Sequence, residues 1–377
     1  MRPDDFIHDD THDTAPAPAS EGGLPEGVRA IVTLAGQTDR VTAVAFAPGR
    51  SDRLLSSGRD GSVAVWDLPE SIDKSGTDAS EVEAELIRHD AAVMDASFWP
   101  DAGGMLLSSG DGTARLVDIA SGEETLRLTR IESMRADAPH QSRLVRSIAS
   151  TANAAGVIVA AVVPLGGLLA AASQSREAGA GVVSATVDAA QGRAVLLDAS
   201  PAVTLYDLLS FEPLRTWKLP SQGPLGVWLT ERGVVAASSE HLMVFAPDEP
   251  KPVARFRPGR GPLRAIVRVG EASFVCAVGT KFFERIDLAS GQIEPLRLLQ
   301  GKVAQAAPLG ERGLLLARTD RVVEVCAAAD RAPACELVMD QPIRAIAGSD
   351  DGSRVAVAGA DHRVRLFELD PSVLRPV

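Results

Sequence analysis

Cysteines are the residues of this chain best suited to metal binding or redox chemistry. Cys276, Cys326 and Cys335 form no Cys-x-x-Cys pair, and no histidine stands at a zinc-binding spacing from them. Because zinc sites need several such ligands at short spacings, the sequence predicts no metal site. Cys326 and Cys335 could face each other across a turn. A disulfide there would need an oxidising compartment, and two buried thiols are the other interpretation.

Motifs of known catalytic or cofactor chemistry are missing from the sequence. It contains no G-x-S-x-G, no phosphate-binding loop and no dinucleotide fingerprint. The histidines are scattered, and two of them, His8 and His12, stand near the start, so a cluster at one site is hard to assemble. The Asp-Gly pairs at 60–61, 111–112 and 351–352 are typical of hairpin turns, not of calcium loops. We therefore expect a protein that is not an enzyme and binds no cofactor; an enzyme or small-ligand sensor is the alternative.

An internal repeat predicts the elements that carry these residues. Residues 41–48 and 54–67 are echoed by residues 93–100 and 106–118. Each copy has the pattern of a strand, a Pro- or Gly-containing turn, a second strand, an Asp-Gly turn and a third strand. Such repetition means that one supersecondary unit is used several times. The fold class is therefore all-β.

The first copy ends in Val65-Trp66-Asp67, and together the two copies resemble the WD40-repeat family. Weaker echoes extend the resemblance over roughly residues 29 to 369, and the unit at 343–369 is again clear. The resemblance implies a β-propeller with about forty residues per blade, so a chain of 377 residues would close as one ring of seven blades. It also implies a rigid scaffold that binds other proteins as a subunit of a multiprotein complex. Arginines far outnumber lysines, which suggests a bacterial source.

The resemblance further implies a buried hydrogen-bonded chain of His, Ser, Asp and Trp within each blade. In the first copy the four positions hold Gln37, Ser56, Asp60 and Trp66, and in the second they hold His89, Ser108, Asp111 and Val117. Neither copy keeps all four residue types, so each network is incomplete. We interpret His89 as a structural residue and not as a ligand.

The ends of the chain predict how the ring closes. The last unit ends on a third strand at 363–369, so the fourth strand of that blade must come from elsewhere. Residues 28–34 form an apolar segment before the first copy, and a strand there would close the ring and cover its open edges.

Residues 119–192 leave the number of blades open. One innermost strand must lie in this region, and both Val145 and Val182 begin suitable segments. Eight blades would result if both are blades; we favour seven, in one domain at 28–377 with an insertion around 129–181. Residues 154–172 carry no charge, but a Pro-Leu-Gly-Gly turn favours buried strands over a membrane span. The polar residues 132–141 are the expected binding loop.

Arginine side chains are the best candidates for a binding site. The residues that follow the first apolar residue of each expected innermost strand lie on one face, because strand side chains alternate with period two. These residues are Thr42, Met94, Arg146, Gly226, Arg264, Ala304 and Arg344. The predicted protein-binding residues are Arg40, Met94, Arg146, Arg264, Lys302 and Arg344. Because arginines bind carboxylates in a bidentate manner, we expect an acidic peptide or loop as partner. Separate solvated side chains paired with local acids are the alternative.

Charge is distributed unevenly over the chain, whose net charge is −12. Residues 1–27 contain seven acids, one arginine and four prolines and show no apolar periodicity, which predicts a disordered acidic tail. That tail either docks on a basic partner or acts as a solubilising extension. An acidic chain with four Trp and one Tyr offers little to nucleic acid. The start lacks the pattern of a secretory signal, so we expect a cytoplasmic protein without membrane insertion.

Overall fold

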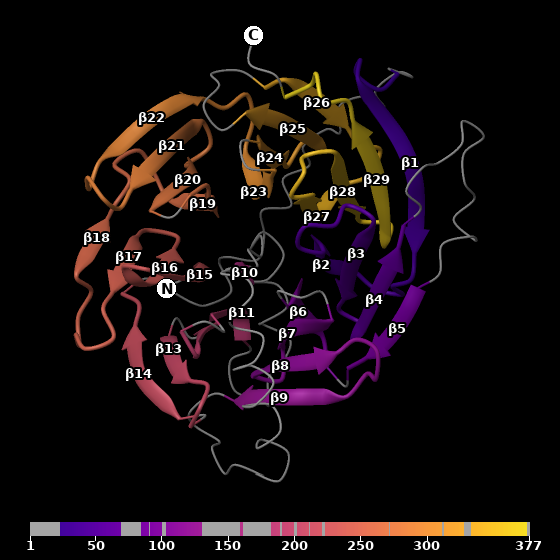
Figure 1. The fold of residues 1–377 in the computed structure, drawn as a ribbon. Coiled ribbons are helices and arrows are strands. Elements are labelled where there is room, and N and C mark those ends of the chain that lie inside the picture. Colours follow the sequence, from indigo (N-terminus) through magenta and orange to yellow (C-terminus); the bar gives the residue numbers. More distant parts are fainter. Residues whose placement is uncertain are drawn as a thin grey trace, which may run out of the picture.

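Seven antiparallel sheets follow one another around a ring, each radiating from the centre like the blade of a propeller (Figure 1). The computed structural model describes residues 23–68, 84–89, 91–99, 103–129, 159–160, 182–188, 191–199, 202–210, 212–220, 223–270, 272–310, 313–327 and 333–374. We number the blades from 1 to 7 by the order of their innermost strands. The prediction of a seven-bladed all-β propeller is confirmed.

Each blade is made largely from consecutive strands. Blade 1 contains β2 (Val41–Phe46), β3 (Arg53–Gly58), β4 (Ser62–Asp67) and β5 (Ala84–Arg88), and blade 2 contains β6 (Val93–Phe98), β7 (Gly104–Ser109), β8 (Thr113–Asp118) and β9 (Glu124–Thr129). Blade 3 contains β10 (Val159–Ala160), β11 (Val182–Asp188), β12 (Arg193–Asp198), β13 (Ala202–Asp207) and β14 (Pro213–Lys218). Blade 4 contains β15 (Pro224–Thr230), β16 (Gly233–Ser238), β17 (Leu242–Phe245) and β18 (Ala254–Phe256).

The remaining blades keep the same order from the centre outward. Blade 5 contains β19 (Leu263–Arg268), β20 (Ser273–Val278), β21 (Phe282–Asp287) and β22 (Ile293–Leu298), and blade 6 contains β23 (Val303–Leu309), β24 (Gly313–Arg318), β25 (Val322–Ala327) and β26 (Cys335–Val338). Blade 7 contains β27 (Ile343–Gly348), β28 (Arg354–Gly359), β29 (Arg363–Leu369) and, as its outer strand, β1 (Val28–Ala35).

The first strand of the chain closes the ring, as the sequence predicts. β1 pairs with β29 in antiparallel register, from Val28 opposite Leu369 to Ala35 opposite Arg363. The residues just before β1 take part as well, because the carbonyl oxygen of Gly27 accepts a hydrogen bond from the amide of Asp370. Residues 1–22 of the predicted tail lie outside the described residues. We call this junction of β1 and β29 the clasp.

The innermost strand of blade 3 comes from the segment that begins at Val182, one of the two candidates in the sequence. Val182 begins β11, which pairs with β12 and contacts the innermost strands β6 and β15 of the neighbouring blades. The two-residue strand β10 pairs with the other edge of β11 as a fifth strand, so we count β11 as the equivalent of the innermost strands of the other blades. The described sheets number seven, so the eight-bladed alternative is wrong. Residues 130–158 and 161–181 lie outside the described residues, and with them Val145, the loop at 132–141 and most of the predicted insertion.

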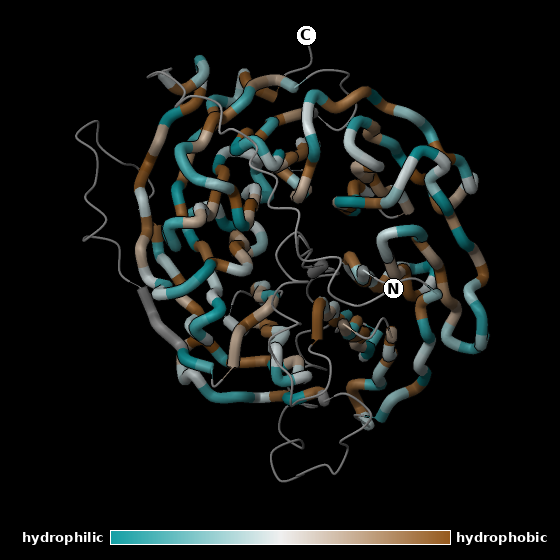
Figure 2. Tube along the Cα trace, turned by 180° about the vertical axis from the view of Figure 1, so that it is seen from behind, coloured by the Kyte–Doolittle hydropathy of each residue, from teal (hydrophilic) through white to brown (hydrophobic). Residues whose placement is uncertain are grey.

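Apolar side chains from neighbouring blades pack against each other and hold the ring together. Trp228 of blade 4 meets Phe274 of blade 5 edge to face, with ring centroids 5.0 Å apart. The buried clusters repeatedly join two successive blades, for example Leu55 and Val65 of blade 1 with Phe98 of blade 2. Apolar and polar residues alternate along many of the strands (Figure 2). Burial of this apolar surface between sheets is the main stabilising contribution to the fold.

Every innermost strand has the same irregularity at one position. Its register with the second strand shifts after the first paired residue, which leaves one unpaired residue, a β-bulge. The seven bulged residues are Thr42, Met94, Val183, Leu225, Arg264, Ala304 and Arg344. The sequence places Gly226 in this set, but β15 begins at Pro224, one residue before its first typical apolar residue, so the bulge falls on Leu225.

Candidate functional site

Strand direction divides the propeller into two faces. In each blade the innermost strand begins beside the end of the second strand, as Val41 pairs with Gly58 in blade 1. The loops that enter the innermost strands therefore lie at the same end as the turns between second and third strands. We call this end the upper face. The opposite end, which carries the turns between third and fourth strands, is the lower face.

Three of the four network positions of blade 1 are joined by hydrogen bonds. Gln37 Nε2 donates to Ser56 Oγ at 2.7 Å, and Trp66 Nε1 donates to the same oxygen at 2.9 Å. Asp60 instead accepts from Thr38 Oγ1 at 2.7 Å and from the amide of Ser62 at 3.0 Å. Partial burial opposes ionisation of Asp60, but the bonds from Ser62 and Thr38 prevail and lower its pKa to about 2. Asp60 thus fixes the upper turn of blade 1.

Blade 2 has a different arrangement from the one that the resemblance implies. In blade 1, Ser56 lies opposite Ala64, the third residue of β4. In blade 2, the third residue of β8 is Arg115, and the residue opposite it is Leu107. Leu107 therefore takes the place of Ser56, and Ser108 lies one position further along, opposite Ala114. The upper turns of both blades have three residues, but the Leu-Leu-Ser-Ser motif begins at the second residue of β3 and at the third residue of β7, which shifts the alignment by one. Asp111 pairs with Arg115 Nη2 at 2.6 Å. His89 accepts from the amide of Ala91 at 3.2 Å, through Nδ1.

Three arginines of blades 7 and 1 converge on the upper face. Arg40 precedes β2, and its carbonyl oxygen accepts from the amide of Arg59 at 3.0 Å. Arg344 is the bulged residue of β27, which contacts β2. Burial, together with the positive charges of Arg344 and Arg59, lowers the pKa of Arg40 to about 10. We name Arg40, Arg59 and Arg344 the blade 7–1 cluster.

The other predicted binding residues have different environments. Arg264 and Lys302 are exposed on the upper face, at the starts of blades 5 and 6. Met94 is only 7% exposed, because its side chain packs in the apolar cluster that includes Val183 and Leu225. Met94 is therefore part of the core and offers no docking surface. Arg146 lies outside the described residues.

A second group of cations, largely missed in the sequence, lies between blades 4 and 5. The amide of Gly279 donates to the carbonyl oxygen of Pro262 at 2.7 Å, which joins the loop that enters β19 to the upper turn of blade 5. These two segments and the end of β18 carry the exposed residues Arg255, Arg257, Arg260, Arg264 and Lys281, which we name the blade 4–5 cluster. Four arginines within residues 255–264, with no acid among them, are the sequence signal for it.

Arg260 is held by two neighbours within the blade 4–5 cluster. Its guanidinium carbon lies 5.0 Å from the centre of the Phe282 ring. Its Nε lies 3.6 Å from Glu284 Oε1, and the Glu284 side chain is only 4% exposed. Burial raises the pKa of Glu284, and the positive charge of Arg260 opposes this rise.

Carboxylates recur on the lower face. Asp118, Asp207 and Asp287 each end a third strand, and Oδ1 of each accepts from the amide of a serine three residues later, at 2.8, 2.9 and 2.7 Å. These bonds lower the pKa of all three groups. The two faces thus present different chemistry, with clustered guanidinium groups above and repeated carboxylates below.

The three cysteines lie in the described part of the chain, and none of them forms a disulfide. Cys276 and Cys326 are buried and Cys335 is half-buried, so burial raises the pKa of Cys326 to about 12 and that of Cys335 to about 11. Among the described residues, no three His, Cys, Asp or Glu side chains come together as a metal site would require. A search of the same residues finds no helix long and apolar enough to cross a membrane.

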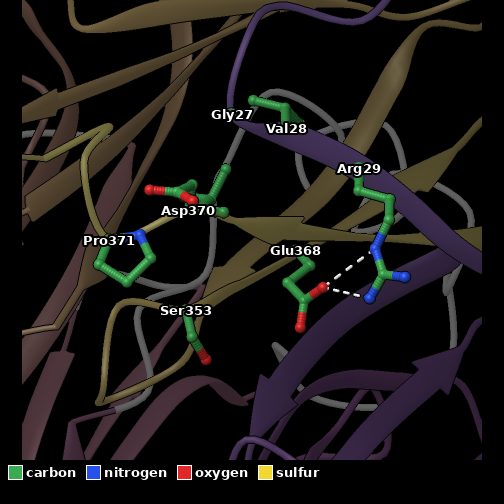
Figure 3. Close-up of a pocket in the computed structure, with 8 residues that line it drawn as sticks. Gly27, Val28, Arg29, Ser353, Glu368, Asp370 and Pro371 are labelled. Atoms are coloured by element: carbon green, nitrogen blue, oxygen red, sulfur yellow. Dashed lines mark hydrogen bonds and ion pairs between the residues drawn. The ribbon is translucent and has the colours of Figure 1, made fainter. Parts of the chain in front are cut away.

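A pocket of about 490 Å³ lies at the lower end of the clasp (Figure 3). It is lined by Gly27, Val28, Arg29, Ser353, Glu368, Leu369, Asp370 and Pro371. Arg29 Nε donates to Glu368 Oε2 at 3.1 Å, and Asp370 Oδ1 accepts from the amide of Ser372 at 2.8 Å. Since these charged groups already bind within the chain, we interpret the pocket as the seam of the closing strand.

Comparison with known proteins agrees with this geometry. The model of the family "WD domain, G-beta repeat" (WD40) matches residues 29–67, 80–118 and 335–368. The chain is 33% identical over 102 residues to small ribosomal subunit protein RACK1 of Schizosaccharomyces pombe, covering 27% of this chain and 31% of that protein. It is 35% identical over 99 residues to RACK1y of Oryza sativa, covering 24% and 30%. The matched region thus spans about three tenths of these relatives.

A solved structure supports the fold over nearly the whole chain. The WD40 β-propeller domain of Doa1 superposes with a TM-score of 0.66 at 12% identity, covering 93% of this chain and 99% of that domain. At this identity the likeness concerns the fold alone. Three segments of the chain thus match the WD40 repeat, and the described sheets form a seven-bladed β-propeller.

Proposed function

We propose that this propeller is a non-enzymatic scaffold that binds other proteins, as a cytoplasmic subunit of a bacterial multiprotein complex. The fold supports this role, because a rigid ring of packed blades presents loops and turns on two faces without needing to change shape. The RACK1 relatives are named as proteins of the small ribosomal subunit, that is, of a large assembly. Their match is confined to about three tenths of their length, so it supports the general role and no particular partner.

The observation that carries the proposal is the concentration of cations on the upper face of an acidic protein. The blade 7–1 cluster and the blade 4–5 cluster lie there, and Lys302 lies on blade 6 between them. Among the described residues, neither Arg59 nor Arg344 forms an ion pair within the chain. Guanidinium groups bind carboxylates with two parallel hydrogen bonds, so an acidic peptide or loop of the partner is the proposed ligand.

Copurification from the native host tests this function. The tagged chain is purified at low salt beside Arg264→Glu/Arg344→Glu, and the associated proteins are quantified by mass spectrometry. We expect stoichiometric partners with the wild type and their loss with the double variant. The melting temperatures should stay alike, because Arg264 is exposed and Arg344 is only half-buried. A third sample lacking residues 1–22 tests whether the acidic segment contributes.

Two results would contradict the proposal. A wild-type protein that purifies alone would favour an enzyme or a small-ligand sensor. Partners that remain on the double variant would mean that the scaffold uses a surface other than the upper-face arginines.

A further inference from the structure

Two glutamates occupy equivalent positions in neighbouring blades. Glu284 is the third residue of β21 and lies opposite Cys276 of β20. Glu324 is the third residue of β25 and lies opposite Leu316 of β24. Both side chains are buried, at 4% and 0% exposure. The chain therefore offers two versions of one arrangement, and the difference between them is informative.

In blade 6 the glutamate is fully paired. Arg297, which lies on the outer strand of blade 5, donates through Nη2 to Glu324 Oε2, and Arg318 donates through Nη1 to Oε1 at 3.3 Å. The side chains of Arg297 and Arg318 are only 4% and 10% exposed. This ion cluster joins blades 5 and 6, and its nearly buried charges are paired with one another.

In blade 5 both of these arginine positions differ. Val278 takes the place of Arg318: Val278 pairs with Leu263, the first residue of β19, and Arg318 pairs with Val303, the first residue of β23. Arg255 is the equivalent of Arg297, because each lies opposite the second residue of the third strand of its blade. Unlike Arg297, Arg255 is exposed, and its Nη2 lies 3.4 Å from His241 Nδ1. Within the described chain Glu284 Oε2 is buried without a hydrogen-bond partner.

Arg260 replaces these arginines, but from a surface loop. Its side chain is 48% exposed, against 4% for Arg297. Glu284 faces its Nε, and the Phe282 ring lies 5.0 Å from its guanidinium carbon. A guanidinium has five N–H groups, so the contact through Nε leaves the four N–H groups of Nη1 and Nη2 outside it. Glu284 and Phe282 together restrict a residue that would otherwise lose considerable freedom on binding.

The surroundings of Arg260 favour an anion. Arg257, Arg264 and Lys281 are exposed on the same joined segments. The segments around Arg260, residues 239–241, 255–264 and 279–284, contain only two acidic residues, Glu240 and Glu284. A Cβ built on Gly259 would meet no atom within 4 Å, so the backbone beside Arg260 is open to approach.

We propose that Arg260 anchors an anion-binding site between blades 4 and 5, which takes a carboxylate or phosphate group on a side chain of a partner peptide. Arg264 and Lys281 add charge to the site, and Phe282 is a positioning residue that acts through Arg260. The proposal rests on the scaffold function and deepens it, because it selects one of the two cation clusters of the upper face as the primary site.

Peptide binding to the full chain tests this site. The probes are a labelled peptide with four aspartates separated by glycines, its asparagine version, and the asparagine version with one phosphoserine; fluorescence anisotropy is followed over a series of salt concentrations. We expect the aspartate peptide to bind and the asparagine peptide to fail. Binding of the phosphoserine peptide would assign phosphate as the preferred group, and its failure would assign carboxylate.

Variants locate the site. Arg260→Met should weaken binding of the aspartate peptide by about tenfold or more, because a charge-assisted hydrogen bond is lost, and it should reduce the salt dependence. Arg363→Met, at an exposed arginine of the upper face in blade 7, is the matched control and should bind as the wild type does. Phe282→Leu should weaken binding several-fold with an unchanged salt dependence, since the charges remain.

The outcomes separate this inference from the scaffold function. If Arg260→Met binds as tightly as the wild type while Arg344→Glu does not bind, the blade 7–1 cluster is the site; the inference is then overturned and the function stands. If the wild type binds none of the peptides, the anion site is overturned, and copurification alone then decides the function. Equal loss with Arg260→Met and Arg363→Met would mean that net charge and not a built site attracts the peptide, which also overturns the inference.

Discussion

We expect Glu324 to stabilise the contact between blades 5 and 6, because it pairs with an arginine of each blade. Glu324→Leu removes the carboxylate that pairs with Arg297 and Arg318. Arg318 keeps Asp320 Oδ1 at 3.0 Å and Glu336 Oε1 at 3.3 Å. Among the described residues, Arg297 keeps only the Cys326 sulfur, at 3.2 Å, as a hydrogen-bond partner. One buried guanidinium is thus left without a carboxylate.

The cost follows from the desolvation of that guanidinium. Removing one partner of a buried ion pair typically destabilises a protein by about 3–5 kcal/mol, and we expect about 3 kcal/mol because only one of the two arginines is stranded. With an unfolding entropy of about 2.1 cal/mol/K per residue over roughly 350 residues, this free energy lowers the melting temperature by about 4 °C. Calorimetry and urea unfolding measure the two quantities independently.

Two further variants control for other effects. Glu336→Gln removes a half-exposed partner of the same Arg318 and should cost less than about 1 kcal/mol. Arg297→Met/Glu324→Leu replaces both charges by apolar groups and should recover most of the lost stability. The reasoning is refuted if Glu324→Leu is as stable as the wild type, or if the double variant is no more stable than the single one.

Three other perturbations have expected outcomes. Deleting residues 28–35 should abolish cooperative unfolding, because it removes the closing strand, whereas deleting residues 1–22 should leave the melting temperature within about 1 °C; limited proteolysis distinguishes the two proteins. The pKa of Asp60 is lower in the folded state, so its contribution is present above pH 4 and disappears as the pH falls towards 2. Asp60→Asn should therefore cost about 1 kcal/mol at pH 7, after allowance for solvent screening, and clearly less at pH 2, where about half of Asp60 is protonated in the folded state, as urea titrations at both pH values would reveal. The raised pKa values of Cys326 and Cys335 predict that both thiols stay unreactive towards a disulfide reagent at pH 8 until the protein is unfolded; rapid reaction in the native state would contradict this.

The blades that the sequence predicts best are those with local signals. Asp60-Gly61, Asp111-Gly112 and Asp351-Gly352 mark turns whose geometry depends on the residues themselves, and the strands beside them alternate regularly. The closing strand at 28–34 could be predicted because the last unit has only three strands of its own. Local patterns and the count of strands thus determine most of the ring.

The parts that the sequence does not reveal depend on contacts between distant segments. Met94 has the pattern of a surface position, yet the packing of blade 2 against its neighbours buries it. Arg260 and Lys281 belong to one cluster only because Gly279 pairs with Pro262 across two turns. The Leu-Leu-Ser-Ser motif begins one residue later in β7 than in β3, so Ser108 is shifted by one position, which motif matching across a gap does not detect.

The clasp also determines how the ring responds to mechanical load. Val28 and Leu369 lie opposite each other, so a force that pulls the two flanking segments apart acts on the same end of the β1–β29 pair. In this geometry the hydrogen bonds are loaded one after another, as in the opening of a zip, and not all together as in shear. The β1–β29 pair should therefore open at low force, starting at Val28 and Leu369, while the remaining six blades stay folded as an arc.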